Sequence, residues 1–235
     1  MRTISHLFVV LLFGLAACGG DQAPSNAGSS SGTLQVTATV TASPTLGIQN
    51  SKTADQFQTD ISVRVWRVIP PAAPVAVPGA TVKVKVGNND YLVPAGNRPE
   101  LYRISIPGGF TDQMVTLNVD SGADFVHGVA RKAPGIQVFT NPTPGQSVSI
   151  AGLAGGPFHV TWTRPAAADI AQLRVSQYDQ QVDDSGAFDV PAANIQQGDA
   201  QDCRLRRTNV VQINSFAGSQ LEVMVQQDLS INVVP

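Results

Sequence analysis

Residues 158–165 read Phe-His-Val-Thr-Trp-Thr-Arg-Pro, and this stretch indicates the fold class of the 235-residue chain. The apolar residues Phe158, Val160 and Trp162 alternate with polar ones. Strict alternation is typical of a half-buried β-strand, which has one face on a core and the other in water. We therefore expect a strand that buries Trp162 and carries His159 on its outer face.

The same alternation recurs along most of the chain. Further strands are predicted by four apolar triplets: Ile61, Val63 and Val65; Val82, Val84 and Val86; Val115, Leu117 and Val119; and Leu221, Val223 and Val225. Turn-forming stretches such as Pro78-Gly79, Pro107-Gly108-Gly109 and Gly155-Gly156-Pro157 separate the strands at short intervals. The weak helical window 166–173 reads more easily as a loop that runs into a strand. Many short strands at regular spacing predict an all-β sandwich or barrel.

A domain boundary is predicted at Ala133-Pro134-Gly135. It leaves strand sets in residues 33–133 and 134–235, each about the 100 residues of an immunoglobulin-type sandwich. The segments 93–97 (Val-Pro-Ala-Gly-Asn) and 190–194 (Val-Pro-Ala-Ala-Asn) are alike, a faint internal repeat too short to prove duplication.

Sequence resemblances refine this prediction. Residues 139–146 (Phe-Thr-Asn-Pro-Thr-Pro-Gly-Gln) precede a strand, and 158–165 form a tryptophan strand that ends in proline. This pattern resembles the opening strands of fibronectin type III and related immunoglobulin-like modules, and residues 184–191 resemble a later strand. Residues 75–84 (Val-Ala-Val-Pro-Gly-Ala-Thr-Val-Lys-Val) are similar to a strand of bacterial immunoglobulin-like and carboxypeptidase-regulatory-like domains. The resemblance implies two immunoglobulin-like β-sandwiches in tandem, and it carries over no binding residue.

The amino terminus has the pattern of a secretory signal peptide. Arg2 supplies a positive charge, the apolar run 7–13 follows, and small residues lead to Cys18. The apolar run is shorter than the roughly 20 residues that span a bilayer. Residues 15–18, Leu-Ala-Ala-Cys, resemble the lipobox of bacterial lipoproteins. That resemblance implies removal of residues 1–17, a diacylglycerol thioether on Cys18 and an acylated amino group, enough acyl chains for stable anchoring.

Residues 18–32 then read as a flexible tether, because the stretch from Gly19 to Gly32 has no apolar residue larger than alanine. Gly19, rather than aspartate, follows the cysteine. By resemblance to enterobacterial lipoproteins this implies the outer membrane, and leaves the periplasmic or surface face open.

Charge and cysteine content exclude several classes of protein. The formal net charge is −2 and no basic block occurs, so we expect no nucleic-acid partner. With Cys18 modified, Cys203 has no partner within the chain, so no disulfide framework is expected. Cys203 is then either a buried free thiol or a residue that pairs between chains, and the oligomeric state stays open.

No catalytic site emerges from the sequence, and we expect no enzymatic activity. There is no Gly-x-Ser-x-Gly elbow, and the histidines that follow Cys18, His127 and His159, read as solvated strand residues. Asp183, Asp184 and Asp189 near one turn are candidate calcium ligands without a calcium-loop motif, and a zinc site lacks cysteine and histidine ligands. No cofactor is expected beyond the lipid, with calcium an unsupported candidate. Trp66 and Tyr178 are candidate carbohydrate-binding rings.

These observations leave three functional hypotheses. The first is a lipid-anchored, non-enzymatic bacterial envelope protein that acts as a protein-binding, spacer or assembly module through an envelope protein partner. The second is a carbohydrate- or matrix-binding adhesion module, calcium-assisted or not, with a polysaccharide partner. The third is an accessory subunit of a separate hydrolase.

Overall fold

The computed structural model of the chain describes residues 25–235 and shows an all-β protein, which confirms the predicted class. In that part of the chain the strands form sheets of nine, six and three strands. The predicted alternation is confirmed in each strand: for example, Ile61, Val63 and Val65 are fully buried, and so are Leu221, Val223 and Val225. The window 166–173 is a loop that enters a strand, as expected.

The nine-stranded sheet, called the long sheet below, contains strands from both halves of the sequence. Its order is β15-β14-β17-β18-β3-β4-β5, with β12 beside β18 and β8 beside β4. The strands are β3 (Leu34–Pro44), β4 (Phe57–Arg67), β5 (Val75–Ala76), β8 (Leu101–Pro107), β12 (Ser147–Ser149), β14 (Ile170–Val175), β15 (Tyr178–Val182), β17 (Gly198–Gln212) and β18 (Gln220–Val234). The pairs β18–β3 and β18–β12 are parallel.

Two smaller sheets cover the long sheet. The six-stranded sheet contains β1 (Ser25–Asn26), β2 (Ser29–Ser30), β6 (Thr81–Val86), β7 (Asn89–Val93), β9 (Met114–Ser121) and β10 (Asp124–Lys132). The three-stranded sheet contains β11 (Phe139–Asn141), β13 (Phe158–Trp162) and β16 (Ala187–Val190). Short helices lie at Ala54–Gln56, Ile150–Leu153 (α1) and Ala192–Asn194. No helix in residues 25–235 is long and apolar enough to cross a membrane.

The long sheet buries the same face along its whole length. On β18, Leu221, Val223 and Val225 contribute to one apolar core, and Leu229, Ile231 and Val233 contribute to a second core. These residues are all odd-numbered, and in a strand alternate residues share a face. The six-stranded sheet therefore covers one half of the buried face, and the three-stranded sheet covers the other half.

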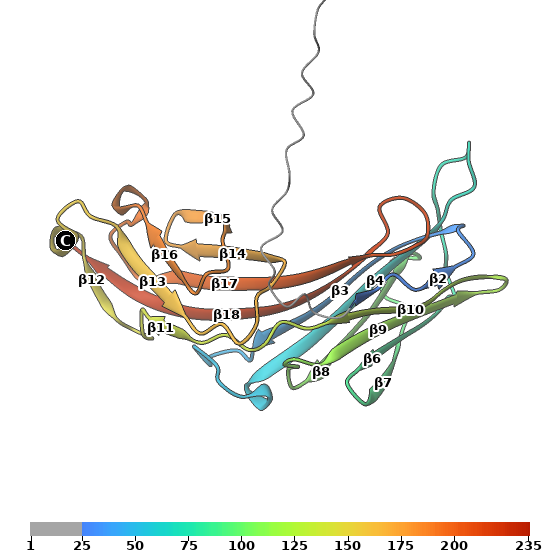
Figure 1. Cartoon of the computed structure of the whole chain (residues 1–235), viewed down its shortest axis with the longest axis horizontal. Helices are drawn as coiled ribbons and strands as arrows, with labels where there is room; N and C mark the ends of the chain where they lie inside the picture. The colour runs from blue at the N-terminus through green and yellow to red at the C-terminus, as the bar shows by residue number, and fades with distance from the viewer. Residues whose placement is uncertain (1–24) are drawn as a thin grey trace, which may run out of the picture.

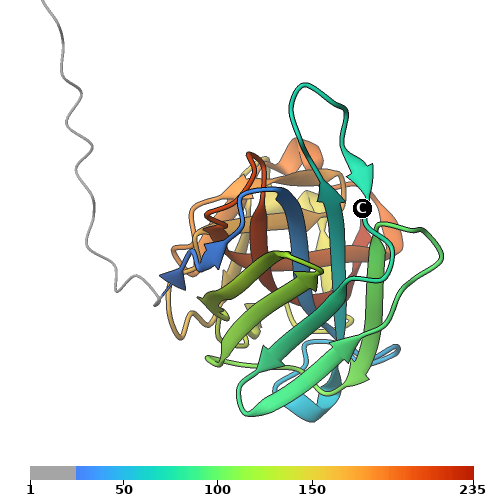
Figure 2. The same cartoon turned by 90° about the vertical axis from the view of Figure 1, so that its right-hand side faces the viewer.

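Strands β17 and β18 join the two halves. Figure 1 shows them as long ribbons that pass from the three-stranded sheet at the left to the six-stranded sheet at the right. Figure 2 views the molecule from the end that carries the six-stranded sheet. Val211 and Val223 pack in the first core with residues from 34–133, so the predicted boundary at 133/134 does not separate two independent packing units. Each such buried valine contributes about 1.5–3 kcal/mol.

The folded body begins earlier than residue 33. Within the segment predicted as tether, Ser25 and Asn26 pair with Arg131 and Ala130, and Ser29 and Ser30 pair with β10 further along. Gly28 has φ +73°, and a Cβ there would lie 2.4 Å from the carbonyl oxygen of His127. Backbone pairing therefore holds a segment that buries almost no apolar surface. The close approach to β10 requires glycine at position 28. The signal peptide, Cys18 and the start of the tether lie outside the described residues.

Candidate functional site

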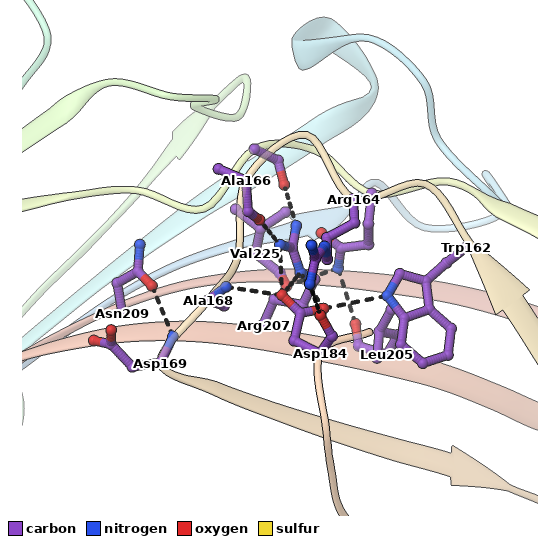
Figure 3. Close-up of polar contacts among 12 residues, drawn as sticks. Trp162, Arg164, Ala166, Ala168, Asp169, Asp184, Leu205, Arg207, Asn209 and Val225 are labelled. Atoms are coloured by element: carbon purple, nitrogen blue, oxygen red, sulfur yellow. Dashed lines mark hydrogen bonds and ion pairs between the residues drawn. The ribbon is translucent and has the colours of Figure 1, made fainter. Parts of the chain in front are cut away.

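The most elaborate polar cluster in the described chain lies between the two cores, where a charged pair is buried. Arg207 on β17 is fully buried, and the Asp184 side chain, from the loop between β15 and β16, is 6% exposed. Nη2 of Arg207 lies 2.8 Å from Oδ2 of Asp184, and Nε lies 3.1 Å from both carboxylate oxygens. Figure 3 shows the pair at the centre of a network of polar contacts. A buried charge of this kind is tolerated only when it is paired and hydrogen-bonded.

Further hydrogen bonds complete the pair. Arg207 donates to the carbonyl oxygens of Gly135 and Ala166, and Asp184 accepts from the backbone N–H of Ala168 and from Nε1 of Trp162. Gly135 belongs to the segment that joins the two halves, and Ala166 and Ala168 belong to the loop before β14. The ion pair thus fixes two loops against the long sheet, as Figure 3 shows.

A second ion pair joins the halves beside the first. Arg131 on β10, nearly buried, donates from Nη2 to both oxygens of Asp169 at 2.6 Å. Asp169 also accepts from the backbone N–H of Val210 at 2.7 Å, and its own N–H donates to Oδ1 of Asn209. Asn209 in turn donates to the carbonyl oxygen of Lys132. A strand of the first half is therefore tied to a loop and a strand of the second half.

Amide side chains extend this polar layer. Gln227 on β18 is fully buried, accepts from the N–H of Ser51 at 2.9 Å, and donates to the carbonyl oxygens of Ser51 and Gln137. Gln137 donates to the carbonyl oxygens of Leu205 and Val225. We call this layer the junction; its members are Ser51, Arg131, Gln137, Asp169, Asp184, Arg207, Asn209 and Gln227.

The structure does not bring the three candidate calcium ligands together. The carboxylate of Asp184 faces Arg207 inside the junction, whereas Asp189 lies on the outer face of β16 with His159 Nδ1 at 2.6 Å. Asp183 is exposed. Within residues 25–235 no group of three or more histidine, cysteine or acidic side chains is placed to hold a metal ion. Asp184 is turned inward because Arg207 requires a counter-charge there.

The two candidate sugar-binding rings lie in different halves. Trp66 is half-buried on β4, on the outer face of the long sheet and opposite Gln35 of β3. Tyr178 on β15 is 8% exposed and packs 5.3 Å from the ring of Phe188, and burial raises the pKa of its hydroxyl. The two rings therefore form no common platform. Trp162 is 4% exposed, which confirms its predicted burial.

His159 lies on the outer face of its strand, as the alternation predicts, and Cys203 is the buried free thiol of the two alternatives. Cys203 is a fully buried free thiol on the inner face of β17, and burial, followed by the nearby Asp228 and Asp202, raises its pKa. A thiol kept neutral by burial is a poor nucleophile. His159 is exposed on β13, and His127 on β10 contacts Asp120 at 2.6 Å and stacks on Phe125.

The outer face of the long sheet carries a second set of charges, which sequence reasoning missed. In one row across four strands, Asp179, Arg174, Arg204 and Asp228 are direct cross-strand neighbours. Gln172 and Arg206 are neighbours in the adjacent row and, with Arg174, Asp179 and Arg204, line a shallow depression. A second depression of about 290 Å³ lies beside it, between the loop 44–49 and strands β17 and β18, and Arg204 lines both. The spacing of Arg204 and Arg206, two residues apart on β17, was the sequence signal for this charged outer face.

Comparisons with protein-family models and with curated proteins find no match for this chain. Function is therefore inferred from the fold and from the side chains themselves.

Proposed function

We propose that this chain is a lipid-anchored, non-enzymatic protein of the bacterial envelope whose folded body is a rigid spacer or assembly module. The observation that carries the proposal is the long sheet, which continues through both cores on β17 and β18. Tandem domains joined by a linker usually move relative to each other unless their interface is large. Here hydrogen-bonded strands and the junction replace the linker, so the body holds a fixed length and shape.

The strand orders support two immunoglobulin-like sandwiches in tandem. In the second half β11-β13-β16 faces β15-β14-β17-β18, and in the first half β3-β4-β8 faces β7-β6-β9-β10. Both halves place the first, second and a later strand in one sheet and the middle and final strands in the other, as immunoglobulin-like sandwiches do. The tandem differs from a simple chain of modules, because the last strand of the second half joins β3 of the first.

The anchor is proposed to act at the middle of the body. Ser25 pairs with Arg131, which is a junction residue, so the described chain begins beside the junction rather than at either end. Only residues 19–24 separate Cys18 from Ser25, and a chain of this length spans at most about 25 Å. A lipid on Cys18 would therefore hold the junction close to the membrane, with one sandwich on each side of the attachment point.

Metabolic palmitate labelling tests the anchor. We expect the label on the wild-type chain to be lost in Cys18→Ala and retained in Cys203→Ala, because Cys203 is buried in the second core. Survival of the label in Cys18→Ala would overturn the proposal.

Crosslinking of the intact protein on cells tests the assembly role. We expect one envelope protein to be recovered in stoichiometric amount. Recovery of the chain alone at saturating crosslinker would contradict an assembly role. Truncation of one sandwich would then test the spacer role.

A further inference from the structure

Arg174, Arg204 and Arg206, called the arginine cluster, lie side by side on the outer face of the long sheet. Arg174 and Arg204 are directly opposite each other on β14 and β17, and Arg206 is the next outward residue on β17. Like charges in directly opposed positions destabilise a sheet. Two aspartates offset this cost, Asp179 on one side of the row and Asp228 on the other. The positive charge is thus concentrated at the centre of the row.

The arginine cluster keeps hydrogen-bond donors available to a ligand. Arg204 uses Nε to bind Asp228 at 2.6 Å, and Arg206 uses Nε to bind Gln226 at 2.7 Å. Nε of Arg174 lies 3.9 Å from Asp179, beyond hydrogen-bond distance. Within the part of the chain that the structure describes, the terminal nitrogens of these three side chains make no hydrogen bond. Guanidinium groups with free terminal nitrogens bind carboxylates in a two-pronged geometry.

The neighbouring depression offers a different chemistry. Its floor includes Asp202 and Ser230, which supply acceptors, and its wall is the loop 44–49, where Leu46 is fully exposed and Ile48 is 37% exposed. The wall is fixed in place, because Gln49 exchanges hydrogen bonds with Ser230 on β18. A preformed depression with acceptors and an apolar wall suits a sugar ring, which presents hydroxyl groups at its edge and C–H groups on its face.

From this arrangement we propose that the outer face of the second half binds an acidic polysaccharide, with a sugar carboxylate on the arginine cluster and an adjoining sugar in the depression beside loop 44–49. Arg204 lines both depressions and so makes them one continuous site. An acidic peptide such as polyglutamate fits less well, because it has neither hydroxyl groups that donate to Asp202 and Asp228 nor a ring face for the apolar wall. The inference is independent of the lipid anchor and of the spacer role.

Binding of the full-length chain in detergent to sodium polygalacturonate, measured by calorimetry, tests the proposal. The variant Arg174→Gln/Arg206→Gln removes two arginines of the cluster. We expect it to raise the dissociation constant at least about tenfold. The matched variant Arg64→Gln/Arg103→Gln removes two arginines from the same outer face in the first half, and we expect a change below about twofold. Equal unfolding midpoints of both variants show that the fold is retained.

Two further polymers identify the source of the carboxylate. We expect dextran, which is uncharged, to bind at least about tenfold more weakly than polygalacturonate, and we expect the same of polyglutamate. Failure of the wild-type chain to bind polygalacturonate would overturn the proposal. So would equal weakening in the matched variant, equal binding of dextran, or equal binding of polyglutamate, which would indicate an acidic protein segment instead.

Discussion

Arg206 and Arg207 are neighbours in the sequence, yet they lie on opposite faces of the long sheet. Arg207 is fully buried and holds Asp184, Gly135 and Ala166 in the junction. Arg206 is half-buried on the outer face and binds Gln226 through Nε alone. The two arginines therefore have different roles. Arg207 forms permanent structural bonds on the inner face of the sheet, and Arg206 keeps donors open to a ligand on the outer face.

The comparison extends to the ion pairs on each face. The inner pair Arg207–Asp184 has exposed fractions of 0% and 6%, and the outer pair Arg204–Asp228 has 27% and 32%. Water screens the outer pair, so it contributes little to stability. Loss of one partner inside leaves a charge without a counter-charge, which is far more costly than loss of one partner outside.

The largest effect is expected from Asp184→Ala. This variant leaves the Arg207 guanidinium buried without its counter-charge, and we expect a loss of about 3–5 kcal/mol in the free energy of unfolding. Urea denaturation of Asp184→Ala beside Asp179→Ala, which removes a half-exposed carboxylate from the outer row, measures the difference between the faces. A loss below about 1 kcal/mol for Asp184→Ala would mean that the junction pair is not structural.

The next largest effect is expected from Gln227→Leu. The leucine cannot bind the N–H and carbonyl groups of Ser51 or the carbonyl group of Gln137, and these groups stay buried. Buried groups without partners cost about 1–3 kcal/mol. We expect a loss of about that size in urea denaturation, against almost none for Gln226→Leu on the outer face. Equal losses for the two variants would contradict the assignment of faces.

The partly exposed ion pair Arg67–Asp124 gives a pH-dependent test. Thr33 and Arg67 donate to Asp124 and hold the pKa of its carboxyl below the usual value, against the opposing effect of burial. Because the folded pKa is depressed, the stabilisation is present above the unfolded value of about 4 and is lost as the pH falls through the folded value. Asp124→Asn should therefore lose less stability than the wild type between pH 7 and acid pH.

The urea midpoint at a series of pH values measures this change. Asp183→Asn replaces an exposed carboxylate and serves as the matched control, which should follow the wild-type curve. A curve for Asp124→Asn that runs parallel to the wild type throughout would show that this carboxylate does not contribute to the acid sensitivity.

The smallest effect is expected from Asp228→Asn on the outer face. The Arg204–Asp228 pair is partly exposed, so its loss should lower the free energy of unfolding by about 0–1 kcal/mol, and added salt should reduce the difference. Urea denaturation at low and high salt measures both. A loss as large as that of Asp184→Ala would remove the distinction between the two faces.

The sequence predicts the strand faces well, because alternation is a local property. Val82, Val84 and Val86 turn inward, and Trp162 is buried, as their spacing indicates. On β18 the inward row continues past Val225 through Leu229 to Val233, with the polar Gln227 between the cores. That row could have indicated one long strand with a polar junction at its centre.

Other features depend on partners that are distant in the sequence. The parallel pairing of β18 with β3 joins residues 183 positions apart, and neither strand's sequence specifies which strand it pairs with. Ser25 to Ser30 have no apolar pattern, and backbone pairing with β10 holds them. Asp184 looks like a turn residue beside Asp183 until the fold places Arg207 next to it.

The central claim is that the shared sheet and the junction make the two halves one cooperative body. The two tryptophans report on it separately, because Trp66 lies in the first half and Trp162 in the second. In Trp162→Phe and in Trp66→Phe, urea unfolding followed by fluorescence of the remaining tryptophan is compared with unfolding followed by far-ultraviolet circular dichroism. Coincident midpoints in both variants are the predicted result. A fluorescence midpoint that separates from the circular dichroism midpoint in either variant would show that the halves unfold independently, and would contradict the claim.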